Sequence, residues 1–185
     1  MGEPGTKEPL SLEELEAAAN LRTGRKHVLS ILVENKTGVL TRIAGLFARR
    51  GFNIDTLTVG PTEDEQISRV TLTVDGAVHP IDQVTKQLHK LVNVLKIRDL
   101  EPGETVAREL ALFKVSADGV QRGELMQIAE IFRGKVVDVT KRSIVVELTG
   151  TCDKVDAFEQ LVRPFGLIEM ARTGEIAIAR GRAET

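Results

Sequence analysis

VLSILVENKTGVLTRIAGLFARRGFNIDTL, residues 28–57, is the stretch that decides the fold. Its first apolar run contains several β-branched residues and predicts a buried strand up to Val33. A polar loop at residues 34–38 follows and ends in a glycine. Apolar residues then recur at helical spacing, and a second strand is expected from Asn53 onward. The stretch therefore predicts a β-α-β unit with a short loop at the start of its helix.

The loop before the helix is a candidate binding site for a small anion. Gly38 accepts a positive φ, and the helix is expected to begin at Gly38 or Val39. The first N–H groups of a helix have no partner within it, and the helix dipole favours a carboxylate there. Asn35 adds an amide that both donates and accepts, which suits a zwitterion. A plain strand-to-helix turn explains the same residues, and on the residues alone it is the preferred interpretation.

A longer segment carries a family resemblance. Residues 29–62, LSILVENKTGVLTRIAGLFARRGFNIDTLTVGPT, resemble the start of the small regulatory subunit of acetohydroxyacid synthase (acetolactate synthase), an ACT-domain family. The resemblance covers residues 27–181 and continues in ordered blocks at 68–69, 84–96, 108–110, 130–134, 137–140 and 172–174. Several long blocks in one order are far more specific than a single glycine motif.

The resemblance implies a regulatory subunit without catalysis of its own. In this family an ACT domain pairs with a second copy and binds a branched-chain amino acid, usually valine, at the pairing interface. The subunit binds and activates a catalytic subunit and makes it sensitive to feedback. Thiamine diphosphate, Mg and FAD are expected on that partner, with no cofactor on this chain. Carried over by motif, the effector-binding residues are Asn35, Lys36, Thr37, Gly38, Val39 and Leu40, faced by Asn53 and Ile54 of the second copy.

The same residues have plain structural interpretations, which stay open. Asn53 is either a turn residue at the end of a strand or a ligand contact. Val39, Leu40 and Ile54 are apolar and would belong to the core of a domain without a ligand. A pocket lined by them would separate valine from leucine or isoleucine weakly, because one methylene is worth about 1–3 kcal/mol.

The first unit is expected to complete a βαββαβ order. Residues 67–74 alternate as a third strand, and residues 94–97 form the last one. Between them a helical stripe comprises Ile81, Val84, Leu88, Leu91 and Val92. Residues 101–104, Glu-Pro-Gly-Glu, indicate a linker.

The order then recurs without the effector loop. The expected strands cover residues 110–115, 136–139 and 144–148, and the helices cover 125–132 and 155–162. The first of these helices is expected to end with a glycine cap at Gly134, which is preferred over a partner contact by the block around Arg133. The second stops at Pro164. Residues 167–168 and 176–178 finish the unit as strand.

The predicted fold class is therefore α+β, with two ferredoxin-like βαββαβ units in tandem. The resemblance identifies residues 26–101 as the ACT domain, for effector binding and dimerisation, and 108–181 as the C-terminal ferredoxin-like domain of the small subunit. Residues 1–25 are expected to be a partly disordered extension with a short helix opened by a capping box at Ser11. This extension either docks on the partner or is solvated, and solvation is preferred.

Composition narrows the classes of function. The 185 residues carry a formal net charge of -2, so we expect no nucleic-acid partner. No apolar run approaches the length of a membrane span, and we expect a cytoplasmic protein. The single cysteine, Cys152, has no partner for an internal disulfide, and packing is its expected role. The three histidines have no spacing for a metal site, and no catalytic triad, carboxylate pair or phosphate loop is found.

Two rival functions remain. An RNA-binding ferredoxin-like module needs aromatic residues on its sheet for base stacking, and this chain has six Phe, no Tyr and no Trp. Phe113 is the one clear aromatic on a predicted strand. The closer rival is an ACT-domain amino-acid sensor of another biosynthetic enzyme. The long match beyond residue 80 argues against it.

Overall fold

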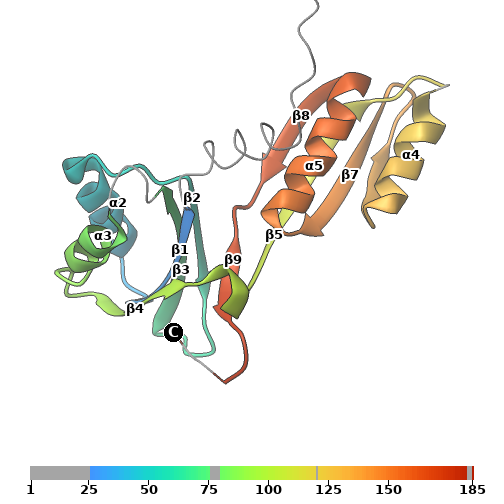
Figure 1. The fold of residues 1–185 in the computed structure, drawn as a ribbon. Coiled ribbons are helices and arrows are strands. Elements are labelled where there is room, and N and C mark those ends of the chain that lie inside the picture. Colours follow the sequence, from blue (N-terminus) through green and yellow to red (C-terminus); the bar gives the residue numbers. More distant parts are fainter. Residues whose placement is uncertain (1–25, 76–79, 120, 183–184) are drawn as a thin grey trace, which may run out of the picture.

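The computed structural model describes residues 26–75, 80–119, 121–182 and 185, which form two antiparallel sheets with two helices packed on one face of each (Figure 1). Residues 1–25 lie outside the described residues, and so does the helix predicted within them.

The first unit has the predicted βαββαβ order. Its elements are β1 (Lys26–Glu34), α2 (Val39–Arg50), β2 (Thr56–Pro61), β3 (Ile67–Asp75), α3 (Ile81–Leu88) and β4 (Val94–Leu100). The strands lie in the order β2-β3-β1-β4, and each neighbouring pair is antiparallel. Because α2 connects the inner strand β1 to the edge strand β2, it covers the β2 side of the sheet.

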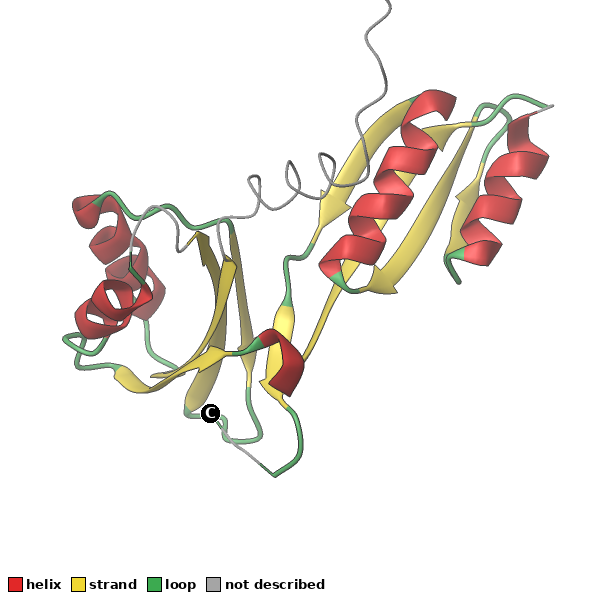
Figure 2. Cartoon of the chain, viewed as in Figure 1, coloured by secondary structure: helices red, strands yellow, loops and turns green. Residues whose placement is uncertain are grey.

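The second unit repeats the order and adds a strand. Its elements are η1 (Pro102–Glu104), β5 (Thr105–Ser116), α4 (Gln121–Ile131), β6 (Lys135–Val139), β7 (Ser143–Gly150), α5 (Cys152–Val162), η2 (Arg163–Phe165), β8 (Leu167–Arg172) and β9 (Ile176–Ala179). The main strand order is β6-β7-β5-β8, and β9 pairs with the first part of β5. Residues 105–108 and β9 thus form a two-stranded ribbon, which lies between the two sheets (Figure 2). The α+β class with two ferredoxin-like units is confirmed.

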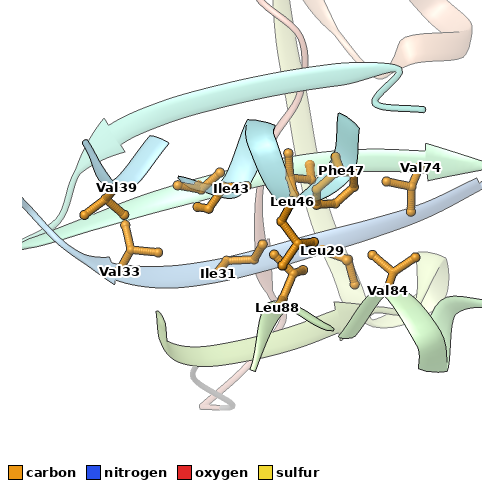
Figure 3. Packing of buried hydrophobic residues seen from close by; sticks show 12 residues of the cluster. Leu29, Ile31, Val33, Val39, Ile43, Leu46, Phe47, Val74, Val84 and Leu88 are labelled. Atoms are coloured by element: carbon orange, nitrogen blue, oxygen red, sulfur yellow. The ribbon is translucent and has the colours of Figure 1, made fainter. Parts of the chain in front are cut away.

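Each sheet buries one apolar face beneath its helices. In β1 the alternate residues Leu29, Ile31 and Val33 are buried, and they face Ile43 and Phe47 of α2 (Figure 3). Successive strand residues point to opposite faces, so this alternation places one apolar row against the helices. In the second unit the rings of Phe113 and Phe158 pack with their centroids 4.9 Å apart.

Three predicted boundaries were wrong. β2 begins at Thr56 instead of Asn53, because the chain first turns after Gly51 and joins β3 only when the N–H of Asp55 donates to the carbonyl of Thr73. α3 ends at Leu88, and Val92 is 88% exposed in the turn that leads to β4. The final predicted strand is two strands, β8 and β9, which pair with different parts of β5.

The end of α4 also differs from the predicted glycine cap. Arg133, with φ 54°, takes the left-handed conformation, and its N–H donates to the carbonyl of Glu130. The N–H of Gly134 donates to the carbonyl of Ala129, which completes a Schellman motif. A Cβ on Gly134 would lie 2.9 Å from Cγ1 of Val146. Gly134 is therefore required for the close approach of β7, and the turn falls on the residue before it.

Replacement of Gly134 by Ala should lower the free energy of unfolding by about 1–3 kcal/mol, as overpacking does. Gly123→Ala is the matched control, because a Cβ at Gly123 in the same helix meets nothing within 4 Å. That change should be neutral or stabilise by up to about 1 kcal/mol. Urea denaturation followed by circular dichroism measures both. Equal effects of the two substitutions would contradict this account of Gly134.

Candidate functional site

The loop between β1 and α2 ends at the N-terminus of a helix with no side-chain cap. Gly38 is the N-cap with φ 84°, and its carbonyl accepts the first helical hydrogen bond, from the N–H of Arg42, at 3.0 Å. The first turn of α2 contains no acidic residue, whereas α3, α4 and α5 carry Asp82, Glu124 and Asp153 there. The positive end of the α2 dipole is therefore left without a compensating charge, which favours an anionic ligand.

Asn35 holds this loop to the turn between β2 and β3. Its backbone N–H donates to the carbonyl of Gln66 at 2.7 Å, and its side-chain Nδ2 donates to the carbonyl of Glu65 at 3.0 Å. Within the described chain its Oδ1 accepts no hydrogen bond. Asn35 thus has the structural role of a turn residue, and its side-chain oxygen is an unused acceptor among the described residues.

Glu34 is the centre of a second group of polar contacts around the loop. Asn93 donates from Nδ2 to its carboxylate, and Lys36 Nζ lies 3.0 Å from Oε1. Oδ1 of Asn93 in turn accepts a 3.0 Å hydrogen bond from Arg42. The Asn93 hydrogen bond, followed by that of Lys36, lowers the pKa of Glu34 below its ordinary value, so Glu34 is a carboxylate at neutral pH. Lys36 is therefore already paired within the chain. Asn93 was not predicted as part of this region, although it lies in a block that carried the resemblance.

The remaining loop residues differ in exposure. Lys36, Thr37 and Gly38 are exposed, and the side chain of Val39 is buried in the core. The structural interpretation of Val39 therefore holds for its side chain, and its backbone N–H already donates to the carbonyl of Lys36 at 3.4 Å. Leu40 is 43% exposed on the first turn of α2, where an aliphatic group is able to contact it.

Asn53 and Ile54 lie beyond the other end of α2. The helix ends at Gly51, whose φ is 69°, and the exposed Asn53 donates from Nδ2 to the carboxylate of Asp55 at 3.0 Å. Ile54 packs against the core and is half-buried. The 12-residue α2 spans about 18 Å, so one chain does not bring these two residues together with the Gly38 loop.

Cys152 belongs to a separate polar cluster around Arg172. Arg172 donates to the carboxylates of Glu109 and Asp156, and its Nη2 lies 3.2 Å from Sγ of Cys152. Burial, followed by the charges of Glu109 and Asp156, raises the pKa of the Cys152 thiol to about 11. The thiol is therefore protonated at neutral pH and is a poor nucleophile.

Alkylation of native Cys152 by iodoacetamide should be slow at pH 8, and its rate should rise until about pH 11. The same chain unfolded in urea is the control, because its only cysteine should then titrate near the ordinary value of about 8.5. The measurement is the rate of carbamidomethylation, by mass spectrometry, as a function of pH. A native midpoint at or below that of the unfolded chain would refute the assignment.

Among the described residues no group of His, Cys, Asp or Glu side chains is arranged to hold a metal ion. No helix in the described ranges is both long and apolar enough to cross a bilayer.

The rival RNA platform requires exposed aromatic residues, and the structure places Phe113 in the core with no exposed surface. The other five phenylalanines are also packed in the two cores. All six phenylalanine rings therefore pack in the two cores, which argues against that function.

Comparison with known proteins identifies the family. Residues 108–181 match the family model for the small subunit of acetolactate synthase, and residues 29–96 match the small subunit-like ACT domain of acetohydroxyacid synthase (AHAS). The probable acetolactate synthase small subunit of Methanothermobacter thermautotrophicus is 51% identical over 156 residues, which cover 84% of this chain and 93% of that protein. The chain belongs to the acetolactate synthase small subunits.

Two further relatives support the same family assignment. The acetolactate synthase small subunit of Mycolicibacterium smegmatis is 48% identical over 155 residues, covering 84% of this chain and 91% of the relative. The crystal structure of the Thermotoga maritima small subunit aligns with a TM-score of 0.79 and 43% identity, covering 86% of this chain and 99% of that one. The resemblance and the ACT-domain assignment are confirmed. An acetolactate synthase small subunit is a regulatory component, so the rival sensor of another enzyme is not supported.

Proposed function

We propose that this acetolactate synthase small subunit binds valine, or the related leucine or isoleucine, between the ACT domains of two copies, and thereby controls a catalytic subunit in the cytoplasm. The observation that carries the proposal is the uncapped, uncompensated N-terminus of α2 behind Gly38. We retain residues 26–101 as the ACT domain and 108–181 as the C-terminal domain, although β5 runs continuously through residue 108.

The chemistry of the loop suits an amino acid. The carboxylate would accept hydrogen bonds from the N–H groups of Leu40 and Thr41, which have no partner among the described residues, at the end of α2 where the dipole favours it. Oδ1 of Asn35 is available to accept from the ammonium group. The exposed Leu40 and, from the second copy, Ile54 would contact the aliphatic side chain. These apolar contacts favour the branched-chain amino acids as a class and separate them weakly from one another.

A two-fold axis beside β2 would complete the site. β2 is an edge strand, and its Val59 is 46% exposed on the helix side of the sheet. Edge strands offer free N–H and C=O groups to a second chain. In such a pair the two α2 helices would run antiparallel, which would bring the Gly38 loop of one copy to Asn53 and Ile54 of the other. Two such sites would arise per dimer.

Control of catalysis would then follow from linkage. The catalytic subunit would hold thiamine diphosphate, Mg and FAD and would carry out the whole reaction, and this chain would raise its activity. Valine would inhibit by binding better to the arrangement of the dimer that activates less. The catalytic subunit must in turn change the affinity for valine by the same factor.

Gly38→Asp should abolish valine binding and feedback, because it places a second anion where the carboxylate binds. Gly38→Asn is the matched control, since it has the same shape, tolerates positive φ and adds no charge. We expect Gly38→Asn to retain part of the valine affinity. Calorimetry measures binding, and the activity of the reconstituted holoenzyme measures feedback and activation.

Activation by the Gly38→Asp chain should persist, because the change lies at the effector site alone. Undiminished valine binding in Gly38→Asp would show that the site is elsewhere. A wild-type chain that fails to raise the activity of its catalytic subunit would contradict the proposed function itself.

Val59→Lys should weaken self-association at least tenfold, about 1.4 kcal/mol, because two like charges would meet across the axis. Leu95→Lys is the control on the opposite edge strand, β4, where Leu95 is 51% exposed. Sedimentation equilibrium measures the dissociation constant of the dimer for both variants. If Leu95→Lys dissociated the dimer and Val59→Lys did not, the pairing edge would be β4.

A further inference from the structure

A second hollow lies on the other side of the first sheet, away from the effector loop. It has a volume of about 320 Å³ and is lined by residues of β2, β3, β5 and β9. The β5–β9 ribbon lies on the side of the first sheet that carries no helices (Figure 1). Arg69 and Thr71 of β3 form part of one wall, and the ribbon supplies Val106, Arg108, Ile176 and Ile178. Both units of the chain thus contribute to one cavity.

The helix-free face of the first sheet is polar, and the ribbon covers it. Ser30, Thr71 and Thr73 are buried on this face without being part of the apolar core. The turn after β8 closes on the sheet, because Thr58 Oγ1 donates to the carbonyl of Thr173 at 3.0 Å. A Cβ on Gly174 would lie only 3.0 Å from the same hydroxyl, so the turn requires a glycine there. The ribbon is therefore held on the sheet by specific contacts.

One face of the ribbon is apolar apart from a guanidinium. Val106 pairs with Ile178, and Arg108 pairs with Ile176, so the four side chains share a face. Ile176 and Ile178 are each more than half exposed, at 59% and 54%. Small-molecule binding sites are typically concave and mostly apolar with a few polar groups, and this surface has that composition.

Within the described ranges, the two arginines of the cavity donate only to uncharged groups. Arg69 donates to Oγ of Ser30 at 2.6 Å and to Oγ1 of Thr185 at 2.9 Å. Arg108 donates to the carbonyl of its neighbour Ala107. Among the described residues no carboxylate lines the cavity or forms an ion pair with either guanidinium. Guanidinium groups beside an apolar wall favour a carboxylate with a hydrocarbon body.

We propose that this cavity binds a small aliphatic carboxylate without an ammonium group, a 2-oxo or 2-hydroxy acid of about five carbons, in the size range such pockets accept. The carboxylate pairs with Arg108 and Arg69, the hydroxyl of Thr71 is available to the oxygen at C2, and the branched end packs on Ile176 and Ile178. An amino acid is disfavoured, because its ammonium would meet two cations and no carboxylate among the described lining residues. Acetolactate, a five-carbon hydroxy-oxo acid, belongs to the favoured class.

The site is independent of the proposed valine site and lies on the opposite face of the sheet. Because its walls come from both units, a bound acid holds the ribbon against the first sheet. Ligand that binds only the folded chain raises the apparent stability. A thermal shift therefore accompanies binding, without any catalytic subunit in the assay.

The test titrates the full chain with 3-methyl-2-oxobutanoate and with valine, which share a carbon skeleton and differ at C2. Acetate is the control for a carboxylate without an aliphatic body. Calorimetry should show saturable binding of the oxo acid by the wild-type chain and by Gly38→Asp alike. Acetate should not saturate over the same concentrations. Loss of valine binding in Gly38→Asp bears only on the proposed effector site.

Arg108→Gln should weaken binding of the oxo acid at least tenfold. Arg108 is exposed, so the fold should tolerate the change. Arg142→Gln removes the same charge from an exposed turn in the second unit and should leave the affinity unchanged. Thermal unfolding of each variant without ligand verifies that the fold is retained.

Three results would overturn the proposal. The first is no saturable binding of the oxo acid by the wild-type chain, or an affinity that Arg108→Gln leaves unchanged. The second is loss of oxo-acid binding in Gly38→Asp, which would place the ligand in the effector loop. The third is an Arg108→Gln chain that retains oxo-acid affinity but no longer assembles with the catalytic subunit, which would make this face a protein-docking surface.

Discussion

Both sheets of this protein carry their helices on one face only, and the rest of the structure depends on what covers the remaining surfaces. In the first unit the other face is polar, with Ser30, Thr71 and Thr73 buried, and the β5–β9 ribbon packs against this sheet. The edge strand β2, with its half-exposed Val59, is left for a second copy. One layer arrangement thus accounts for the contact between the units, for the cavity with two arginines, and for the proposed pairing of ACT domains.

Helix α2 connects this architecture to regulation. Its N-terminus lacks both a side-chain cap and an acidic residue, although α3, α4 and α5 each carry an acidic residue in the first turn. An effector carboxylate would supply the missing charge. Its C-terminus leads through Gly51 to Asn53, about 18 Å away along 12 residues. A small amino acid cannot touch both ends in one chain, so a site that uses both requires two chains.

The sequence predicted the elements well where the pattern is local. The Gly38 turn, the start of α2 and the tandem βαββαβ order all follow from periodicity and glycine chemistry. Long-range pairings were not predictable in this way. The bond of Asn35 to Glu65 and that of Glu34 to Asn93 join residues 30 and 59 positions apart. The separate pairing of β9 was also missed, because the apolar residues 176–178 predict a strand without indicating which part of β5 it pairs with. Gly134 was predicted to be a helix cap. A glycine required by close packing against β7 and a glycine required by a turn look the same in a sequence.

The central claim is that each effector site takes the Gly38 loop of one copy and Asn53 of the other. Mixing Gly38→Asp chains with Asn53→Asp chains tests it most directly, by calorimetric titration with valine after subunit exchange. Each variant alone should bind no valine. A mixed dimer keeps one site with both native halves, so the mixture should recover about a quarter of the wild-type capacity if exchange is random in a symmetric dimer. A mixture that binds no more valine than the separate variants would contradict the shared site, because sites contained within single chains would all be damaged.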